Sequence, residues 1–313
     1  MVVTEVFAYN FQNYTQIKSN IARYSKENSM SDIIYFALTQ DVSNIKQTNL
    51  DGRWGFGDVL RGVNNLHSVC QDLELELKLL SNNHPLGQIL NMCDDEIDDL
   101  DPRSLKFIRF ETREEMCDHV LQLRSSTEKP IIFTNGFGVW DTKYAMEFNE
   151  FIKPKIKFQK QSNETTLAIK QKIGNYDILH VRLGDEALFE NSYVIPKQLI
   201  NFIDRIKKPT ILISDCESFK DLYRASTLIH VSKNVAVHTG VTNSKEKLIE
   251  TINDFKLMMG AENIYTYSIY SWVSGFAIAA SEINKVNIYN IKKVSIFTKV
   301  KRRIKKVFSL WQK

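Results

Sequence analysis

The 313-residue sequence predicts an α/β protein built on parallel sheets, and three observations lead to that prediction. Short apolar runs, typical of buried strands, alternate with helical segments over residues 177–259. An apolar run at 33–38 precedes a glycine-rich turn at 52–57 and a helical pattern. The composition, with 43% hydrophobic and 25% charged residues, is that of a folded, water-soluble protein. It excludes collagen-like, low-complexity and disordered chains.

The first half of the chain contains the elements of one sheet. Residues 33–38 and 131–134 are apolar runs of the kind that buried strands have, and residues 73–79 alternate leucine with charge, as in a half-buried strand. From Asp58 onward, apolar residues recur at helical spacing: Val59, Leu60, Val63, Leu66 and Val69. The pattern predicts a strand, a glycine turn and a helix.

The second half shows the alternation of strands and helices that parallel sheets require. Its strand-like runs are residues 177–181, 210–214, 228–231 and 235–237. Its helical segments are residues 196–206, 218–225 and 245–259.

The length fits two domains with a cleft between them, or one large α/β domain. A polar, lysine-rich stretch at 155–172 suits a helix or connector between two domains. We therefore predict an N-terminal α/β domain over residues 1–160, a C-terminal α/β domain over 161–290 and a tail over 291–313.

The charge distribution argues against nucleic acid as a partner. Residues 292–313 hold nine of the 41 basic residues and no acid, which leaves 32 basic against 37 acidic residues elsewhere. The body is therefore mildly acidic, whereas a nucleic-acid binder needs a basic face on its folded part.

The cysteines do not indicate a metal site or disulfides. The four cysteines are Cys70, Cys93, Cys117 and Cys216. They form no CxxC pair and have no metal-ligand spacing, and a chain of this size does not need disulfides for its stability. The sequence also lacks a signal-peptide pattern and any run of 18 apolar residues, which favours a cytoplasmic location.

A first candidate site follows the apolar strand that ends near Leu179, with His180, Arg182 and Asp185. Ligands of parallel sheets bind beyond the carboxyl ends of the strands, so these side chains are expected in a cleft. An arginine there can clasp a diphosphate, and an aspartate can hold the arginine or a sugar hydroxyl. The alternative is a salt bridge beside a core histidine.

A second candidate site follows strand 210–214, where Ser214 is succeeded by Asp215. Asp215 either accepts hydrogen bonds from a base or ribose, or caps the helix that begins near Ser218.

Two further segments favour close approach of a ligand to the backbone. Residues 267–277 are rich in hydroxyls and small side chains, and small residues that open a helix leave N–H groups for a phosphate. The alternative there is a plain packing helix. The turn at Gly55 and Gly57 lets the backbone approach a ligand or another chain, although it lacks the third glycine of a dinucleotide fingerprint.

Together and in this order, the four sites resemble the GT-B fucosyltransferase superfamily. It groups α1,2- and α1,6-fucosyltransferases, protein O-fucosyltransferases and the rhizobial nodulation fucosyltransferase. The match runs from about Trp54 to Ile283, and its most specific part is the His-x-Arg-x-Gly-Asp pattern at 180–185. The resemblance implies a GT-B-like fold, with two Rossmann-like domains whose parallel sheets face a cleft, the first on the acceptor side and the second binding the nucleotide sugar. It also implies an inverting transfer from GDP-fucose to a glycan hydroxyl, without a metal ion or other cofactor.

The resemblance assigns roles to the candidate residues. Arg182 contacts the β-phosphate, supported by His180 and Asp185, while Ser214 and Asp215 lie near the nucleotide. The phosphates are held by three residues of the third segment: Ser268, Tyr270 and Ser271. Across the cleft, the turn with Gly55 and Gly57 brings Asp58 to the sugar.

An inverting transfer also needs a base for the acceptor hydroxyl. Asp58 is the first candidate, and Asp185 is the alternative if it is not locked to Arg182. Two departures from the family limit the transfer of details. Leu183 follows Arg182 where the α1,2 and α1,6 enzymes have a second arginine, and Asp58 stands where relatives often have asparagine. The acceptor and the linkage are therefore left open, as are two alternatives: another nucleotide sugar, or an inactive nucleotide- or sugar-binding protein.

The sequence of the tail, residues 291–313, predicts contact with a membrane. Lysines and arginines cover most of this predicted helix. Its apolar residues fall on one face: Phe297, Val300, Ile304, Val307, Phe308 and Trp311. A basic amphipathic helix of this kind is typical of peripheral attachment to an anionic surface, here the inner face of a membrane, with a lipid-linked glycan as acceptor. The alternative is a terminal helix docked on the protein's own body.

Overall fold

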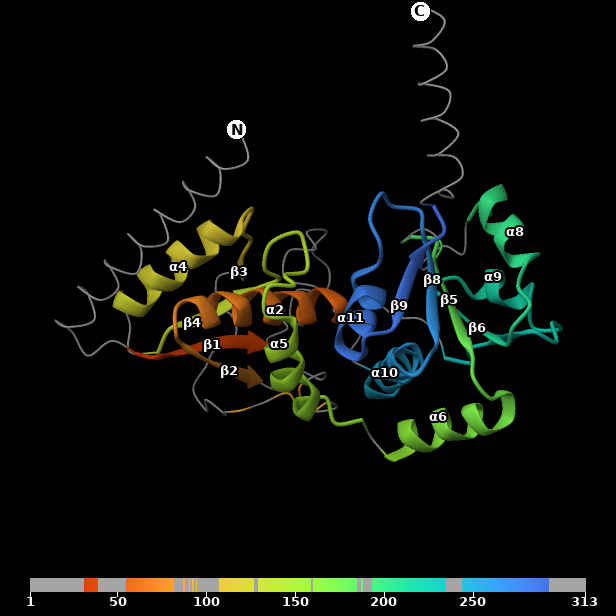
Figure 1. Ribbon diagram of the computed structural model, residues 1–313, viewed down its shortest axis with the longest axis horizontal. Coiled ribbons are helices and arrows are strands. Elements are labelled where there is room, and N and C mark those ends of the chain that lie inside the picture. The colour runs from red at the N-terminus through yellow and green to blue at the C-terminus, as the bar shows by residue number, and fades with distance from the viewer. Residues whose placement is uncertain are drawn as a thin grey trace, which may run out of the picture.

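A computed structural model describes most of the chain between residues 31 and 292 (Figure 1). The described residues are 31–38, 55–81, 107–126, 129–158, 160–184, 193–234 and 244–292, with the single residues 87, 90, 92, 94 and 187. They form two parallel sheets with helices packed on them, so the predicted α/β class with two parallel sheets is confirmed.

The first sheet has four parallel strands in the order β2-β1-β4-β3. Its strands are β1 (Ile33–Leu38), β2 (Glu76–Ser81), β3 (Phe107–Ile108) and β4 (Ile131–Thr134). Its helices are α2 (Phe56–Asp72), α4 (Arg113–Ser126) and α5 (Ala145–Ile152). Because α2 joins β1 to the parallel strand β2, these elements form one βαβ unit.

Helix α2 carries the first half of the chain to the site. Its residues Leu60, Val63, Leu66 and Val69 recur every three positions and are fully buried. Each such burial contributes roughly 1.5–3 kcal/mol relative to exposure, so packing of this face holds the helix in place. The helix begins at Phe56, directly after Gly55, and this end faces the second sheet (Figure 1).

The second sheet has five parallel strands in the order β7-β6-β5-β8-β9. Its strands are β5 (Asp177–Arg182), β6 (Thr210–Ser214), β7 (Ile229–Val231), β8 (Asn263–Ser268) and β9 (Asn287–Asn290). Its helices are α8 (Lys197–Ile203), α9 (Glu217–Asp221), α10 (Lys245–Met259) and α11 (Gly275–Asn284). The chain runs from β5 outward to β7 and then returns to β8 on the other side of β5, which makes β5 the switch point of the sheet.

A continuous apolar core joins the two halves. It contains buried residues of the first sheet, of α2, and of α10 and α11, which lie between the two sheets (Figure 1). A second core covers the opposite face of the second sheet beneath α8 and α9. The 3-10 turn η2 (Lys153–Lys155) and helix α6 (Lys160–Ile173) connect the two halves. The domain boundary near residue 160 stays a prediction.

Several predicted elements have the bounds that the sequence indicates, and others differ. Strands 33–38, 131–134 and 210–214 and helix 245–259 are confirmed to the residue. The strand expected at 73–79 begins instead at Glu76, because α2 continues to Asp72 and the chain then turns at Glu74, whose φ is 56°. Strands β8 and β9 were not predicted.

Some predictions fall on residues that the structure does not describe. These are the strand at 235–237, the site residue Asp185 and the amphipathic tail beyond Lys292. Among the helices in the described part, none combines the length and the hydropathy needed to cross a membrane.

Candidate active site

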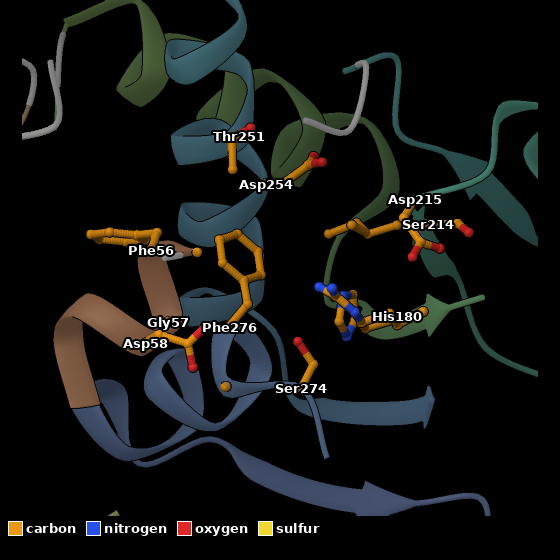
Figure 2. A pocket seen from close by; sticks show the side chains of 14 residues that line it. Phe56, Gly57, Asp58, His180, Ser214, Asp215, Thr251, Asp254, Ser274 and Phe276 are labelled. Carbon is orange, nitrogen blue, oxygen red and sulfur yellow. The ribbon is translucent and has the colours of Figure 1, made fainter. Parts of the chain in front are cut away.

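A pocket opens where the carboxyl ends of β5 and β6 face the first turns of α2 and α11 (Figure 2). Its volume, including the open mouth, is about 720 Å³. It is lined by Gly55, Phe56, Gly57, Asp58, His180, Arg182, Ile213, Ser214, Asp215, Thr251, Asp254, Ser274, Gly275 and Phe276. Both halves of the chain therefore contribute to one pocket.

The topology explains why these residues meet. The pocket lies at the switch point of the second sheet, where connections leave neighbouring strands in opposite directions and open a crevice. The strand register aligns Arg182 with Ser268 and Val181 with Ser214, so the polar ends of three strands lie in one row.

His180 is a neutral, buried side chain on the pocket wall. It alternates along β5 with Leu179 and Val181, which belong to the core on the other face of the sheet. Burial, together with the charge of Arg182, lowers the pKa of His180 to about 3. Its Nδ1 has no hydrogen-bond partner among the described residues. Near pH 7 the ring is therefore an uncharged part of the pocket wall.

Arg182 follows on the same face of β5, where the strand ends at the pocket. Its guanidinium carbon lies 5.6 Å from the centre of the Tyr270 ring, a cation–π contact. The ring of Tyr270 is itself stacked on Trp272. The aromatic pair therefore helps to set the position of a cation on the pocket wall.

Asp215 holds the turn that follows Arg182. Its Oδ1 accepts a hydrogen bond from the N–H of Leu183 at 2.7 Å, and its Oδ2 accepts one from that of Gly184 at 3.0 Å. Burial raises the pKa of Asp215 above its ordinary value, against the effect of these bonds and of Arg182. The helix-cap alternative is wrong, because α9 begins after Cys216 without a side-chain cap.

Ser214 is buried at the end of β6, beside this carboxylate. Its hydroxyl accepts a hydrogen bond from the Cys216 N–H at 3.2 Å. Ser214 therefore shapes the turn after β6 and lines the pocket from there.

The first turns of α2 and α11 touch at the pocket. A Cβ on Gly57 would lie 2.2 Å from the carbonyl carbon of Gly275, so the two backbones approach as only glycine allows. The first N–H groups of any helix lack intrahelical partners, and the helix dipole adds partial positive charge there. Two such ends in one pocket form a site that favours an anion.

Asp58 lies at the rim, in the first turn of α2. Its Oδ1 lies 2.9 Å from an Arg61 guanidinium nitrogen, and the Asp58 side chain is 40% exposed. Arg61 also donates to the carbonyl of Asn135, just after β4, at 3.3 Å. The carboxylate is thus held between the pocket and the carboxyl edge of the first sheet.

Asp254 and Thr251, one turn apart on α10, also line the pocket, and they were not predicted. Oδ1 of Asp254 accepts hydrogen bonds from Ser232 at 2.6 Å and from Asn234 at 2.7 Å. Oδ2 has no donor among the described residues. The only feature of the sequence that could have indicated Asp254 is its charge next to the apolar stripe of helix 245–259.

Burial raises the pKa of Asp254 from 3.8 to about 6. The fold therefore favours the protonated form of Asp254. The contribution of this group to the free energy of unfolding is complete below about pH 4 and is lost as the pH rises through 6. At neutral pH the chain retains a buried carboxylate at a cost in stability. Such a group in a cleft is typical of functional sites.

The predicted site residues divide into three groups. Seven line the pocket: Gly55, Gly57, Asp58, His180, Arg182, Ser214 and Asp215. Three do not: Ser268, Tyr270 and Ser271. The reason is that β8 ends at Ser268, and a six-residue loop separates it from α11, which begins at Gly275. Ser274, Gly275 and Phe276 occupy the expected place. Asp185 lies outside the described residues.

Within the described ranges, no three His, Cys, Asp or Glu side chains are close enough together to hold a metal ion.

No protein-family model matches the sequence, and neither does any curated protein. The fold does resemble solved fucosyltransferases. The comparison with NodZ from Bradyrhizobium gives 14% identity and a TM-score of 0.47, covering 80% of this chain and 92% of that one. A mutant of Arabidopsis thaliana FUT1 in complex with GDP gives 9% and 0.48, covering 90% and 78%. POFUT1 in complex with GDP gives 9% and 0.32, covering 83% and 74%. These are proteins of the kind that the sequence resemblance names, but identities and scores this low fix no residue's role in this chain.

Proposed function

We propose that the chain is an inverting, metal-independent glycosyltransferase that transfers fucose from GDP-fucose to a hydroxyl of a glycan acceptor. One observation supports this above all. A single pocket combines an arginine and two helix N-termini, which suit a diphosphate, with a buried carboxylate that suits the N–H groups of a guanine.

The cationic side of the pocket suits the two phosphates. Arg182 offers a planar fork of donors, which matches phosphate oxygens in pairs. The N-terminus of α11 at Gly275 and that of α2 at Phe56 add the partial positive charge of two helix dipoles. These groups neutralise charge without a metal ion, which is the basis for proposing metal independence.

The other side of the pocket suits a guanine ring. Guanine presents N1–H and N2–H₂ as neighbouring donors, and the Oδ2 atom of Asp254 accepts such bonds when the carboxylate is ionised. The hydrogen bonds from Ser232 and Asn234 to Oδ1 fix the orientation of the carboxylate. The neutral ring of His180 lines the pocket between the two ends.

The reaction needs a base and a stabilised leaving group. An acceptor oxygen attacks the anomeric carbon while the bond between that carbon and the diphosphate oxygen breaks. The configuration at the anomeric carbon inverts, and GDP leaves with both bonding electrons. Arg182 and the helix N-termini stabilise the charge that grows on the diphosphate. Asp58, held by Arg61 at the rim, takes the proton of the acceptor hydroxyl.

The acceptor is proposed as a glycan hydroxyl. Its attachment to a lipid and the association with an anionic membrane depend on residues 292–313, of which only Lys292 is described. Both stay predictions from the sequence.

Turnover of the donor tests this proposal. With GDP-fucose and a mixture of oligosaccharide acceptors, we expect GDP release and a fucosylated product in EDTA at the same rate as with Mg²⁺ or Mn²⁺. Mass spectrometry of the acceptors measures the product, and UDP-glucose and GDP-mannose serve as control donors. Activity that EDTA abolishes and Mn²⁺ restores contradicts metal independence. Bound GDP without turnover of any donor favours the inactive-binder alternative.

A further inference from the structure

A lysine side chain is buried within two hydrogen bonds of the pocket. Lys220, on α9, is only 1% exposed, although lysine is almost never fully buried unless it is paired. Its Nζ atom donates to Oε1 of Glu217 at 2.5 Å and to the backbone carbonyl of Asn234 at 2.7 Å. The Glu217 side chain is 41% exposed, so the lysine is the buried member of this ion pair.

Asn234 connects the lysine to the pocket. Its side-chain Nδ2 donates to Oδ1 of Asp254 at 2.7 Å, while its carbonyl accepts the bond from Lys220. Its backbone N–H donates to the hydroxyl of Ser232 at 3.3 Å, and that hydroxyl donates to the same Oδ1 at 2.6 Å. The position of Asn234 therefore affects both donors to the carboxylate that lines the pocket.

The topology explains how α9 reaches this segment. Helix α9 follows β6, and β7, which pairs with β6, is followed directly by Ser232 and Asn234. A lysine on α9 can therefore hold the chain beyond the end of the neighbouring strand. The ion pair alone does not account for a buried lysine, because desolvation of the two charges offsets most of their attraction.

The charge of Lys220 also acts on Asp254. Burial raises the pKa of Asp254 to about 6, whereas the bonds from Ser232 and Asn234 and the charge of Lys220 lower it. Glu250, one turn earlier on α10, raises it. The other ionisable groups of the pocket lining are Asp58, His180, Arg182 and Asp215. Without Lys220, the carboxylate would take up its proton at a higher pH.

We propose that Lys220 is a positioning residue for the guanine end of the pocket: it holds the backbone of Asn234, so that the Asn234 amide fixes Oδ1 of Asp254 and leaves Oδ2 for the base. This proposal rests on the proposed function. Lys220 does not line the pocket, so it acts through Asn234 and not by contact with the nucleotide.

The full chain with Lys220→Met tests the proposal, because methionine keeps an unbranched apolar side chain without the ammonium group. At pH 7.5 we expect the Kd for GDP-fucose to rise about tenfold, since the acceptor of the guanine N–H groups is no longer held in place. The pH below which affinity falls should also move up by about one unit, because a nearby cation favours the ionised carboxylate. Calorimetric titrations across the pH range measure both changes.

Arg224→Met is the matched control. Arg224 is a second cation paired with Glu217, at 3.5 Å, but its side chain is 50% exposed and lies outside the pocket lining. This variant should bind GDP-fucose as the wild type does at every pH. Thermal unfolding of both variants shows that the binding measurements are made on folded protein.

Asn234→Ala tests the same connection without removing the lysine. It should also weaken the binding of GDP-fucose, and the double variant should lose less affinity than the product of the two single losses, because the two residues act in one chain of bonds. Losses that multiply fully overturn the proposal, as does a normal Kd with a normal pH profile in folded Lys220→Met. If Lys220→Met does not fold, Asn234→Ala decides: a weakened affinity supports the proposal and an unchanged one overturns it.

Failure of the proposed function is recognised separately, as absence of GDP and GDP-fucose binding by the wild type. In that case, NMR of the carboxyl carbon of Asp254, assigned with Asp254→Asn, decides in the ligand-free protein. A titration midpoint that rises in Lys220→Met but not in Arg224→Met supports control of this carboxylate by Lys220. The same midpoint in both variants overturns it.

Discussion

Replacing Arg182 with lysine is expected to lower kcat for transfer by about 100-fold to 1,000-fold while the fold is kept. Losing one preorganised donor to a developing oxyanion costs about that much in other enzymes. Lysine preserves the charge but not the planar fork of donors that matches phosphate oxygens in pairs. Steady-state kinetics with GDP-fucose measure the change, and thermal unfolding checks the fold.

Arg205→Lys is the matched control, because Arg205 is an exposed arginine between α8 and β6, outside the pocket lining. It should retain full transfer. Near-normal transfer by Arg182→Lys, or a loss explained by unfolding alone, would make Arg182 a structural residue.

Replacing Gly57 with alanine is expected to destabilise the protein by about 2 kcal/mol and to abolish nucleotide binding. The added Cβ would lie 2.2 Å from both the Gly275 carbonyl carbon and the Phe276 nitrogen, and backbone atoms cannot move aside cheaply. Overpacking of this kind costs up to about 3 kcal/mol, against a gain of about 1 kcal/mol for alanine in a helix. Separation of α2 from α11 would also dismantle the site that both helix ends form.

Chemical denaturation measures the stability loss, and two other glycines serve as controls. Gly138→Ala should be neutral, because no atom lies within 4 Å of its added Cβ. Gly275→Ala should also be tolerated, since its nearest atom is 3.5 Å away. Equal losses of stability for all three substitutions would contradict this account, because the close contact between α2 and α11 would then not depend on a glycine at position 57.

Much of the site could be predicted because parallel strands end at a common edge. The strand before Arg182 is an aliphatic run that ends in polar residues, which predicted His180 and Arg182 in a cleft, while the resemblance placed Ser214 and Asp215 near the same nucleotide. The glycine turn does mark a close backbone approach, although the partner is Gly275 of the same chain and not a ligand or another chain.

The remainder depends on contacts that local patterns do not encode. β8 reads as mixed tyrosine, threonine and asparagine, and its strand character comes from pairing with β5 in the interior of the sheet. The N-terminus of α11 lies at Gly275, beyond the residues to which the resemblance assigned the phosphates, because a six-residue loop follows β8. Asp254 lies within a helix that was correctly predicted, and only the folded chain shows that its carboxylate lines the pocket.

The central claim, a guanine-nucleotide site, is tested most directly by thermal unfolding with nucleotides present. A ligand at 100 times its Kd stabilises the native state by about 2.7 kcal/mol, so GDP should raise the Tm clearly more than equal concentrations of UDP or CMP do. Because the pKa of Asp254 is raised to about 6 and the ionised form accepts the guanine N–H groups, affinity for GDP-fucose should fall about tenfold per pH unit below 6. GDP-fucose is the ligand for this pH series because both of its phosphates are esterified. The Asp254→Asn variant should bind GDP-fucose weakly, with an affinity that does not change with pH. Equal stabilisation by all three nucleotides at pH 7.5 would contradict the claim.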